Sequence, residues 1–234
     1  MEHLMIRTLK DPAELAKIPA LERAIWGNDD PLPVSWLRVL TDLGGEVSVA
    51  YLDQRPEKFL GFTMSIGSYD HRGRLLYSHQ AGVLPEWQGH GIGRLLKYHQ
   101  SRWAEQAGYR RILWTFDPLR TLNAYFNIGI LGAEPISYHP DYYGPLTSAL
   151  NQGLPTDRIL CEWRVPAPMP RRRPERVCFK IYIPQDMGLL KREEPEQALR
   201  WRETVKNQFL DALNAGYRVV GFSIAPSPAY LLSN

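Results

Sequence analysis

A glycine-rich loop, Gln88-Gly89-His90-Gly91-Ile92-Gly93, is the segment whose residue types and spacing most directly suggest chemistry. It stands between a predicted strand over 75–83 and a predicted helix over 91–107. Glycines let a backbone approach a ligand closely, and the first N–H groups of a helix have no partner within the helix. Such a loop is suited to bind an anion, most naturally a pyrophosphate. A simple turn without a ligand is the alternative explanation for the same glycines.

The spacing of these glycines excludes two familiar nucleotide-binding loops. The dinucleotide fingerprint G-x-G-x-x-G that starts at Gly91 and Gly93 requires a third glycine where Leu96 stands. A P-loop requires Gly-Lys-Ser/Thr, which does not follow. The loop is therefore an anion-binding candidate of another kind, and a nicotinamide oxidoreductase is disfavoured.

His79 lies nine positions before Gln88, on the predicted strand that enters the loop. An imidazole with an ordinary pKa of about 6.5 is suited to remove a proton at neutral pH. Tyr77 shares the face of His79 by strand alternation. The pair predicts a site for general acid–base chemistry, although both residues are equally compatible with ordinary packing.

The elements that must position these residues follow from hydrophobic periodicity. Their order is β-α-α-β-β-β-α-β-α-β-β, and one helix crosses between neighbouring strands. This order predicts an α/β (α+β) fold with a mixed, partly parallel central sheet flanked by helices. The predicted strands cover 4–9, 47–51, 60–66, 75–83, 111–116, 133–138 and 159–165, and the predicted helices cover 12–26, 34–43, 91–107 and 119–130.

A proline-rich and arginine-rich stretch predicts a division of the chain. Residues 1–165 form the expected main domain, 166–176 the linker, and 177–234 a C-terminal βαβ unit. The unit is too short to bury much apolar surface alone, so it should pack on the main domain or on a second chain. A homodimer is thus one option.

Composition excludes several other classes. The formal net charge of +3 is small for 234 residues, which gives little reason to expect nucleic-acid binding. No apolar run approaches the roughly 20 residues needed to cross a bilayer. The cysteine residues, Cys161 and Cys178, do not suggest a disulfide framework, so a cytoplasmic location is expected. The scattered histidines predict no metal site.

The segment from Val83 to Leu96, which contains the glycine loop, resembles motif A of the GNAT acyl-CoA N-acyltransferases. That motif reads [Gln/Arg]-x-x-Gly-x-[Gly/Ala], and every position matches here. The resemblance implies a GNAT-like fold over residues 1–165 and acyl-CoA, either acetyl-CoA or succinyl-CoA, as cosubstrate. It also implies that loop amides through Gly93 and Arg94 hold the coenzyme pyrophosphate. Backbone groups near Ala81 and Val83 would pair with pantetheine, and an N–H near Val83 would polarise the thioester oxygen.

A second region, around Asn123 and Tyr125, looks like the family's other coenzyme-contacting helix. The resemblance implies a pantetheine contact for Asn123. The family's usual tyrosine, which protonates the leaving thiolate, would fall at Ile128, so this chain departs from the pattern. Tyr125, one turn earlier, is the predicted replacement. Arylalkylamine N-acetyltransferases carry a strand histidine as far before their motif as His79 lies before Gln88.

The chain's layout also resembles a bacterial GNAT subgroup linked to N-acylated amino acids. The predicted function is therefore transfer of an acetyl or succinyl group to a primary amine, with an amino acid as one option, by direct attack with general-base assistance. An amino-acid carboxylate would need a cation, for which Arg120 and Arg38 are candidates. Asn28, Asp29 and Asp30 lie where the resemblance implies acceptor specificity and could bind a cationic acceptor, although helix-capping and turn chemistry explain them equally well. The alternative function is a catalytically weak acyl-CoA-binding sensor or interaction module.

Overall fold

The computed structural model describes residues 2–27, 31–144, 154–168 and 176–234. The chain divides into two compact units, each of which is described by itself. The first unit contains Met1–Leu113 and Arg164–Ala167, and the second contains Trp114–Trp163 and Pro168–Asn234. The predicted division at residues 165 and 177 stays a prediction, and residues 169–175 of the predicted linker lie outside the described part.

The first unit is built on five strands in the order β1-β2-β3-β4-β5. Neighbours from β1 to β4 are antiparallel, and β4 and β5 are parallel. The predicted mixed, partly parallel sheet is confirmed. The strands are β1 (Leu4–Thr8), β2 (Glu46–Leu52), β3 (Arg55–Asp70), β4 (Gly73–Val83) and β5 (Arg111–Phe116), whose last residues belong to the second unit.

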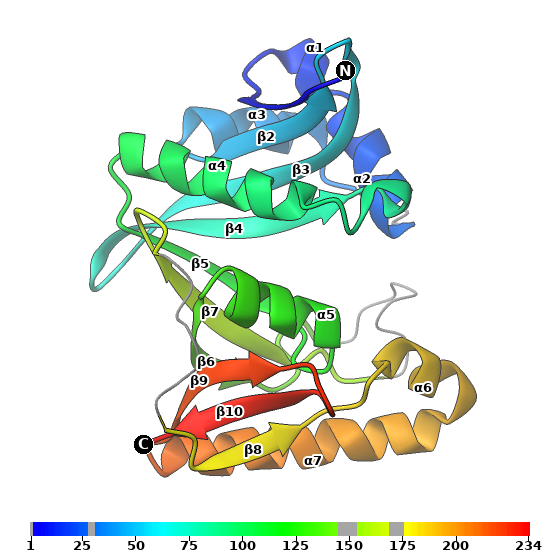
Figure 1. Ribbon diagram of the computed structural model, residues 1–234. Coiled ribbons are helices and arrows are strands. Elements are labelled where there is room, and N and C mark those ends of the chain that lie inside the picture. Colours follow the sequence, from blue (N-terminus) through cyan, green and yellow to red (C-terminus); the bar gives the residue numbers. More distant parts are fainter. Residues whose placement is uncertain (1, 28–30, 145–153, 169–175) are drawn as a thin grey trace. The chain divides into compact units, whose positions relative to one another are not determined.

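Helices cover both faces of this part of the sheet (Figure 1). Alternate strand residues point to opposite faces, so Val49 and Phe62 pack with Leu37 in one buried cluster. Leu60 packs with Leu96 in a separate cluster under the long helix. The helices of the first unit are α1 (Pro12–Leu15), α2 (Ile18–Trp26), α3 (Val34–Asp42) and α4 (Ile92–Gln106), with a short 3₁₀ turn η1 (Pro85–Trp87) before α4.

The single helix expected over 12–26 was wrong, because the structure has α1 and α2 there. Asp11 caps α1 through its side chain, as expected. Pro19 explains the break: it has no N–H to donate, and its ring would clash with a helical carbonyl four residues earlier. Pro19 instead occupies the first turn of α2, where a proline is tolerated.

The second unit contains the end of β5, which β7 and then β6 follow in the sheet order. A separate antiparallel sheet has the order β8-β10-β9, and α7 runs beside it (Figure 1). Aromatic rings of Tyr138, Phe209, Phe222 and Tyr230 pack together in this unit. Its elements are α5 (Thr121–Ala124), the π-helix η2 (Tyr125–Ile130), β6 (Glu134–His139), β7 (Arg158–Arg164), β8 (Phe179–Tyr182), α6 (Met187–Glu193), α7 (Pro195–Asn214), β9 (Arg218–Ser223) and β10 (Ala229–Ser233).

The second unit differs from expectation at α5 and η2 and in its C-terminal part, where α6 is an additional helix. The helix expected over 119–130 is a short α-helix that continues as the π-helix η2. The C-terminal βαβ unit contains a further strand, β10, which lies between β8 and β9 and is antiparallel to both. The turn Ala225-Pro226-Ser227-Pro228 reverses the chain and makes this pairing possible. No helix in the described residues is long and apolar enough to span a membrane.

Candidate functional site

The glycine loop presents main-chain N–H groups at the start of α4. Gly89 has φ +81° and Gly91 has φ +79°, a left-handed conformation that favours glycine. No side chain caps α4, and the backbone bond from Leu95 N to Gly91 O, 3.2 Å, begins its hydrogen-bond ladder. The amides of Ile92, Gly93 and Arg94 precede that bond, so they are available to an anion.

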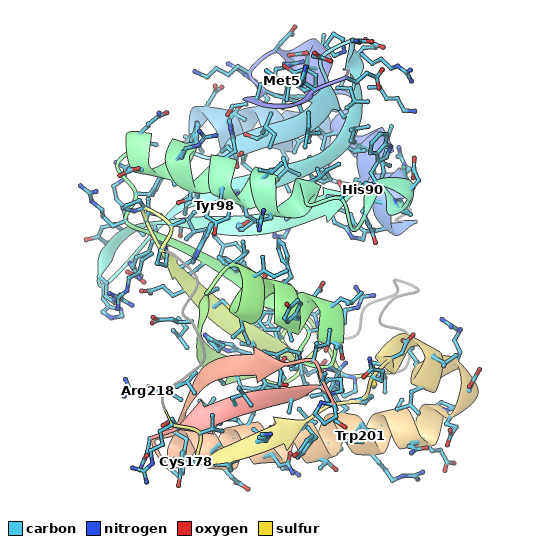
Figure 2. The ribbon with its side chains drawn as sticks, in the orientation of Figure 1. Met5, His90, Tyr98, Cys178, Trp201 and Arg218 are labelled. Atoms are coloured by element: carbon cyan, nitrogen blue, oxygen red, sulfur yellow. The ribbon has the colours of Figure 1, made fainter. Side chains whose placement is uncertain are left out.

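Side chains on both sides hold this loop in place. Ile92 is buried with Leu96 and Leu60, so the first residue of α4 anchors the loop to the core. Gln88 donates from Nε2 to the carbonyl oxygen of Val83 at 3.1 Å, which ties the loop to the end of β4. His90 lies in the loop before α4 (Figure 2), with Nδ1 3.0 Å from the carbonyl oxygen of Gln88.

The end of β4 has a backbone edge that points away from β3. Leu84 donates its N–H to Leu60 O of β3 at 2.9 Å. Successive residues of a strand direct their N–H and C=O groups to opposite sides. Ala81 and Val83 therefore direct theirs away from β3, whereas the register pairs of β4 with β5 are at Leu76 and Tyr77. Apart from the carbonyl oxygen of Val83, which accepts from Gln88, this edge can pair with an extended ligand such as pantetheine.

His79 is the additional residue of a β-bulge in β4. Gln80 pairs with Met64 and Ser78 pairs with Ser65, so β4 has one more residue than β3 between these pairs. A bulge bends the strand and redirects a side chain, and bulges are frequent beside active sites. The rings of His79 and Tyr77 lie with centroids 6.4 Å apart, so the structure brings the two predicted residues together.

The environment of His79 favours the neutral imidazole. The side chain is exposed, yet surrounding protein atoms make the charged form less favourable and lower the pKa of His79 below its ordinary value. The carboxylate of Glu22 acts in the opposite direction and raises this pKa. A neutral imidazole can accept a proton at neutral pH.

Glu22 is a residue of this site that the sequence analysis missed. It lies on α2 and is 1% exposed. Its Oε1 accepts a 2.8 Å hydrogen bond from Gln80 Nε2, and its Oε2 accepts one from Leu32 N at 3.2 Å. The available signal was its position four residues after Ile18, on the apolar side of the helix, where a carboxylate is unusual.

A buried polar network lies on the other side of β4. Lys97 of α4 donates from Nζ to Ser78 Oγ at 3.0 Å and to Gln100 Oε1 at 2.7 Å. Gln100 Nε2 in turn donates to Glu46 at 3.2 Å, and burial raises the pKa of Glu46. Because Ser78 directly precedes His79, this network fixes the strand beside the bulge.

A glycine allows α2 to pack on β4. A Cβ at Gly82 would lie 2.7 Å from Cζ2 of Trp26 and 3.0 Å from Cγ2 of Ile25. Trp26 also meets Phe62 edge to face, with ring centroids 5.6 Å apart. Gly82 lies between Ala81 and Val83, so this packing defines the position of the backbone edge.

The remaining candidates on α5 and η2 belong to the second unit. Asn123 is exposed, and Tyr125 is 38% exposed. Ile128 is only 8% exposed, so its side chain belongs to the core. A Cβ at Gly129 would lie 2.9 Å from the ring of Tyr125, so a glycine is needed beside that ring. The coenzyme roles of Asn123 and Tyr125 stay predictions.

The predicted acceptor-binding cations lie on different elements. Arg120 is the exposed N-cap residue of α5. Arg38 on α3 is engaged by Asp42 at 2.9 Å and donates to Lys10 O at 3.0 Å. Asn28, Asp29 and Asp30 lie outside the described residues. Within the described residues, no group of three or more histidine, cysteine, aspartate and glutamate side chains could hold a metal ion.

Comparisons with known proteins identify the family. The profile of the acetyltransferase (GNAT) family matches residues 15–129. A search of curated protein sequences finds no match. Among solved structures, yncA of Salmonella typhimurium, solved with its cofactor acetyl-CoA, is 19% identical, with a TM-score of 0.54, over 69% of this chain and 94% of that one.

Two further structures have the same fold. A GNAT-family acetyltransferase from Streptococcus pneumoniae is 16% identical, with a TM-score of 0.56, over 70% of this chain and 100% of that one. The ribosomal-protein-S18-alanine N-acetyltransferase from Escherichia coli is 15% identical, with a TM-score of 0.54, over 76% of this chain and 100% of that one. The family match and the fold agree, so this chain carries a GNAT acetyltransferase domain over residues 15–129 and is a GNAT-type acyl-CoA N-acyltransferase.

Proposed function

We propose that this chain transfers an acetyl or succinyl group from acyl-CoA to a primary amine, with the coenzyme pyrophosphate bound by the amides of Ile92, Gly93 and Arg94. The observation that carries the proposal is the start of α4, where these amides precede the first intrahelical hydrogen bond and no side chain caps them. A diphosphate complements such amides in both charge and hydrogen bonding. Gln88, Gly89, His90 and Gly91 shape the loop around it.

The backbone edge of β4 is proposed to hold the pantetheine arm and the thioester. Ala81 and Val83 direct their main-chain groups away from β3, as an added extended ligand requires. An N–H near Val83 would then stabilise negative charge on the thioester oxygen during attack. Asn123 is the proposed pantetheine contact from the second coenzyme-contacting helix.

The proposed reaction is a direct attack without a covalent enzyme intermediate. The amine nitrogen forms a bond to the thioester carbon, and the bond from that carbon to sulfur breaks. His79 takes the proton that the amine loses, either directly or through a water molecule. The lowered pKa of His79 supports this role, because the neutral base then predominates at neutral pH. Tyr125 is the proposed donor of a proton to the thiolate, and Tyr77 lines the site.

The proposed acceptor is a small-molecule amine, with an amino acid as the specific candidate. Arg120 and Arg38 are the cations proposed for its carboxylate. Arg38 already forms an ion pair with Asp42 and a hydrogen bond to Lys10 O, which favours Arg120, the N-cap residue of α5. The Escherichia coli enzyme of the same fold is named for an alanine of ribosomal protein S18 as its acceptor, which supports an amine as the acceptor class. The cytoplasmic location, the absence of nucleic-acid and membrane partners, and the homodimer stay predictions.

A second candidate function is an acyl-CoA-binding sensor or interaction module with weak catalysis. The observation that favours it is Ile128, which is buried in the core where the family's usual tyrosine would stand. This candidate retains coenzyme binding but has little or no turnover.

Thiol release separates the two functions. Purified protein is incubated with acetyl-CoA and with succinyl-CoA across a panel of amines and amino acids. The enzyme proposal expects amine-dependent thiol release that His79→Ala reduces by at least about tenfold, while His71→Ala, an exposed histidine outside the site, leaves it unchanged. Stabilisation by CoA without turnover on any acceptor favours the sensor.

A further inference from the structure

The segment Asp117–Thr121, which leads from β5 into α5, is held by the C-terminal elements of the second unit. Arg202 of α7 makes a bidentate pair with Asp117, with Nη1–Oδ1 2.7 Å and Nη2–Oδ2 3.0 Å. Tyr230 of β10 donates its hydroxyl to Pro118 O at 2.7 Å. Thr121 donates from Oγ1 to Pro184 O at 2.9 Å. Two C-terminal elements, α7 and β10, and the connection between β8 and α6 therefore bind one short segment.

The pair between Arg202 and Asp117 is buried. The two side chains are 4% and 15% exposed. Although burial acts to raise it, the pKa of Asp117 is lowered overall because Arg202 binds its carboxylate. A planar guanidinium that pairs bidentately with a carboxylate fixes orientation as well as distance. Asp117 also accepts a 2.9 Å bond from Leu119 N, so the pair fixes the turn that precedes α5.

The other two contacts fix the backbone on either side of that turn. Tyr230 is fully buried, and its ring packs against Phe209 and Phe222, so its hydroxyl has little freedom to move. Thr121 is the first residue of α5 and is buried as well. The hydrogen bonds at the two ends of Pro118–Thr121 fix the position of this segment relative to the C-terminal sheet.

We propose that Arg202, Tyr230 and Thr121 are positioning residues that set α5 and η2 for coenzyme binding. This inference rests on the proposed function, because Asn123 and Tyr125 follow the fixed segment by a few residues. A contact to pantetheine requires its partner group to be held within a fraction of an ångström, and supporting hydrogen bonds provide that. The C-terminal elements thus support α5 and η2, the proposed second coenzyme-contacting region of the same unit.

The test uses substitutions that remove a single hydrogen bond in the full chain. Tyr230→Phe and Thr121→Val remove the contacts to Pro118 O and Pro184 O and keep the side-chain shape. Tyr138→Phe is the matched control, because its buried hydroxyl donates to Asp157 Oδ2 at 2.7 Å in the same unit and not to the segment. We measure the Kd for CoA by calorimetry, the KM and kcat with acetyl-CoA, the melting temperature, and deuterium exchange of the amides over 119–130.

We expect Tyr230→Phe and Thr121→Val each to raise the Kd for CoA by at least about threefold, on the scale of one hydrogen bond, and to speed exchange over 119–130. Tyr138→Phe should lower the melting temperature by a similar amount but leave the Kd unchanged. The inference is overturned if all three variants lose similar stability while the Kd, KM and exchange over 119–130 stay at wild-type values. A wild-type chain that does not bind CoA overturns the proposed function together with this inference. Normal wild-type binding with unaffected variants overturns this inference alone.

Discussion

Gln80 donates from Nε2 to Oε1 of Glu22 at 2.8 Å, and this bond joins a buried carboxylate on α2 to the strand residue that directly follows His79. The same carboxylate raises the pKa of His79, which opposes the lowering caused by the surrounding protein atoms. A charge on α2 therefore influences the proton affinity of the proposed base on β4. That relationship makes the pH dependence of the reaction testable.

Glu22→Gln should shift the acid limb of the pH profile. Loss of the negative charge makes the imidazolium of His79 less favourable, so the pKa of His79 falls further below its ordinary value. Because the neutral form is the active base, the acid limb of kcat/KM should move to lower pH. The measurement is kcat/KM for acetyl-CoA from acid to neutral pH.

Glu105→Gln is the control for this shift, since Glu105 is an exposed residue on α4. It should leave the acid limb where it is in the wild type. If the acid limb stays in place in Glu22→Gln, or moves to higher pH, the charge of Glu22 does not raise the pKa of the catalytic base.

Gly91→Ala should weaken coenzyme binding more than it weakens the fold. The left-handed conformation at φ +79° disfavours alanine by about 1 kcal/mol. A Cβ there would meet nothing within 4 Å, so the substitution strains the loop without a clash. The measurements are the Kd for CoA and the melting temperature.

Gly216→Ala is matched to this variant, because Gly216 has φ +84° and a Cβ there also meets nothing within 4 Å. Both variants should lose similar stability, and only Gly91→Ala should bind CoA more weakly. Equal affinity for CoA in the two variants argues against the loop as the pyrophosphate site.

Gly82→Ala should displace the edge of β4. Its Cβ would lie 2.7 Å from Cζ2 of Trp26, an overpacked contact with a rigid ring, and such contacts typically cost about 1–3 kcal/mol. Both the melting temperature and the affinity for CoA should fall. The double variant Trp26→Leu/Gly82→Ala should regain part of the affinity, because the smaller side chain makes room. If the double variant recovers no affinity for CoA, a clash with the indole of Trp26 is not the reason why position 82 needs a glycine.

Tyr125→Phe should lower kcat and leave the KM for acetyl-CoA near the wild-type value, because protonation of the thiolate occurs only during the reaction. Steady-state kinetics with the best amine of the panel measure both constants. Tyr182→Phe, which alters an exposed tyrosine of β8, serves as the control. If kcat in Tyr125→Phe equals that of the wild type, solvent or another residue protonates the thiolate.

Local patterns predicted the fold well where neighbouring residues determine the structure. Alternation along β2 and β4 and helical spacing in α4 depend on residues close in sequence, so these elements lie within a few residues of the expected bounds, whereas β3 (Arg55–Asp70) extends well beyond the expected 60–66. The bulge at His79 could not be predicted, because it arises from the register of β4 against β3. The role of Pro19 was readable from the sequence but was overlooked in favour of the apolar spacing around it.

The parts of the site that depend on distant residues were the least predictable. Arg202 and Asp117 are 85 positions apart, and no pattern in either segment specifies the other. Strand β10 pairs with β8 and β9 through its backbone, and backbone pairing leaves little trace in residue types. Glu22, in contrast, is recognisable from the sequence, because a charged residue at an apolar position of a helix needs a polar or charged partner.

Calorimetric titration of the wild-type chain with CoA and with pantetheine tests the central claim most directly. The account predicts that CoA binds and that pantetheine, which has no pyrophosphate, binds at least about a hundredfold more weakly, as the loss of several charge-assisted hydrogen bonds implies. Equal affinities for the two compounds, or no heat of binding with millimolar CoA, would contradict it.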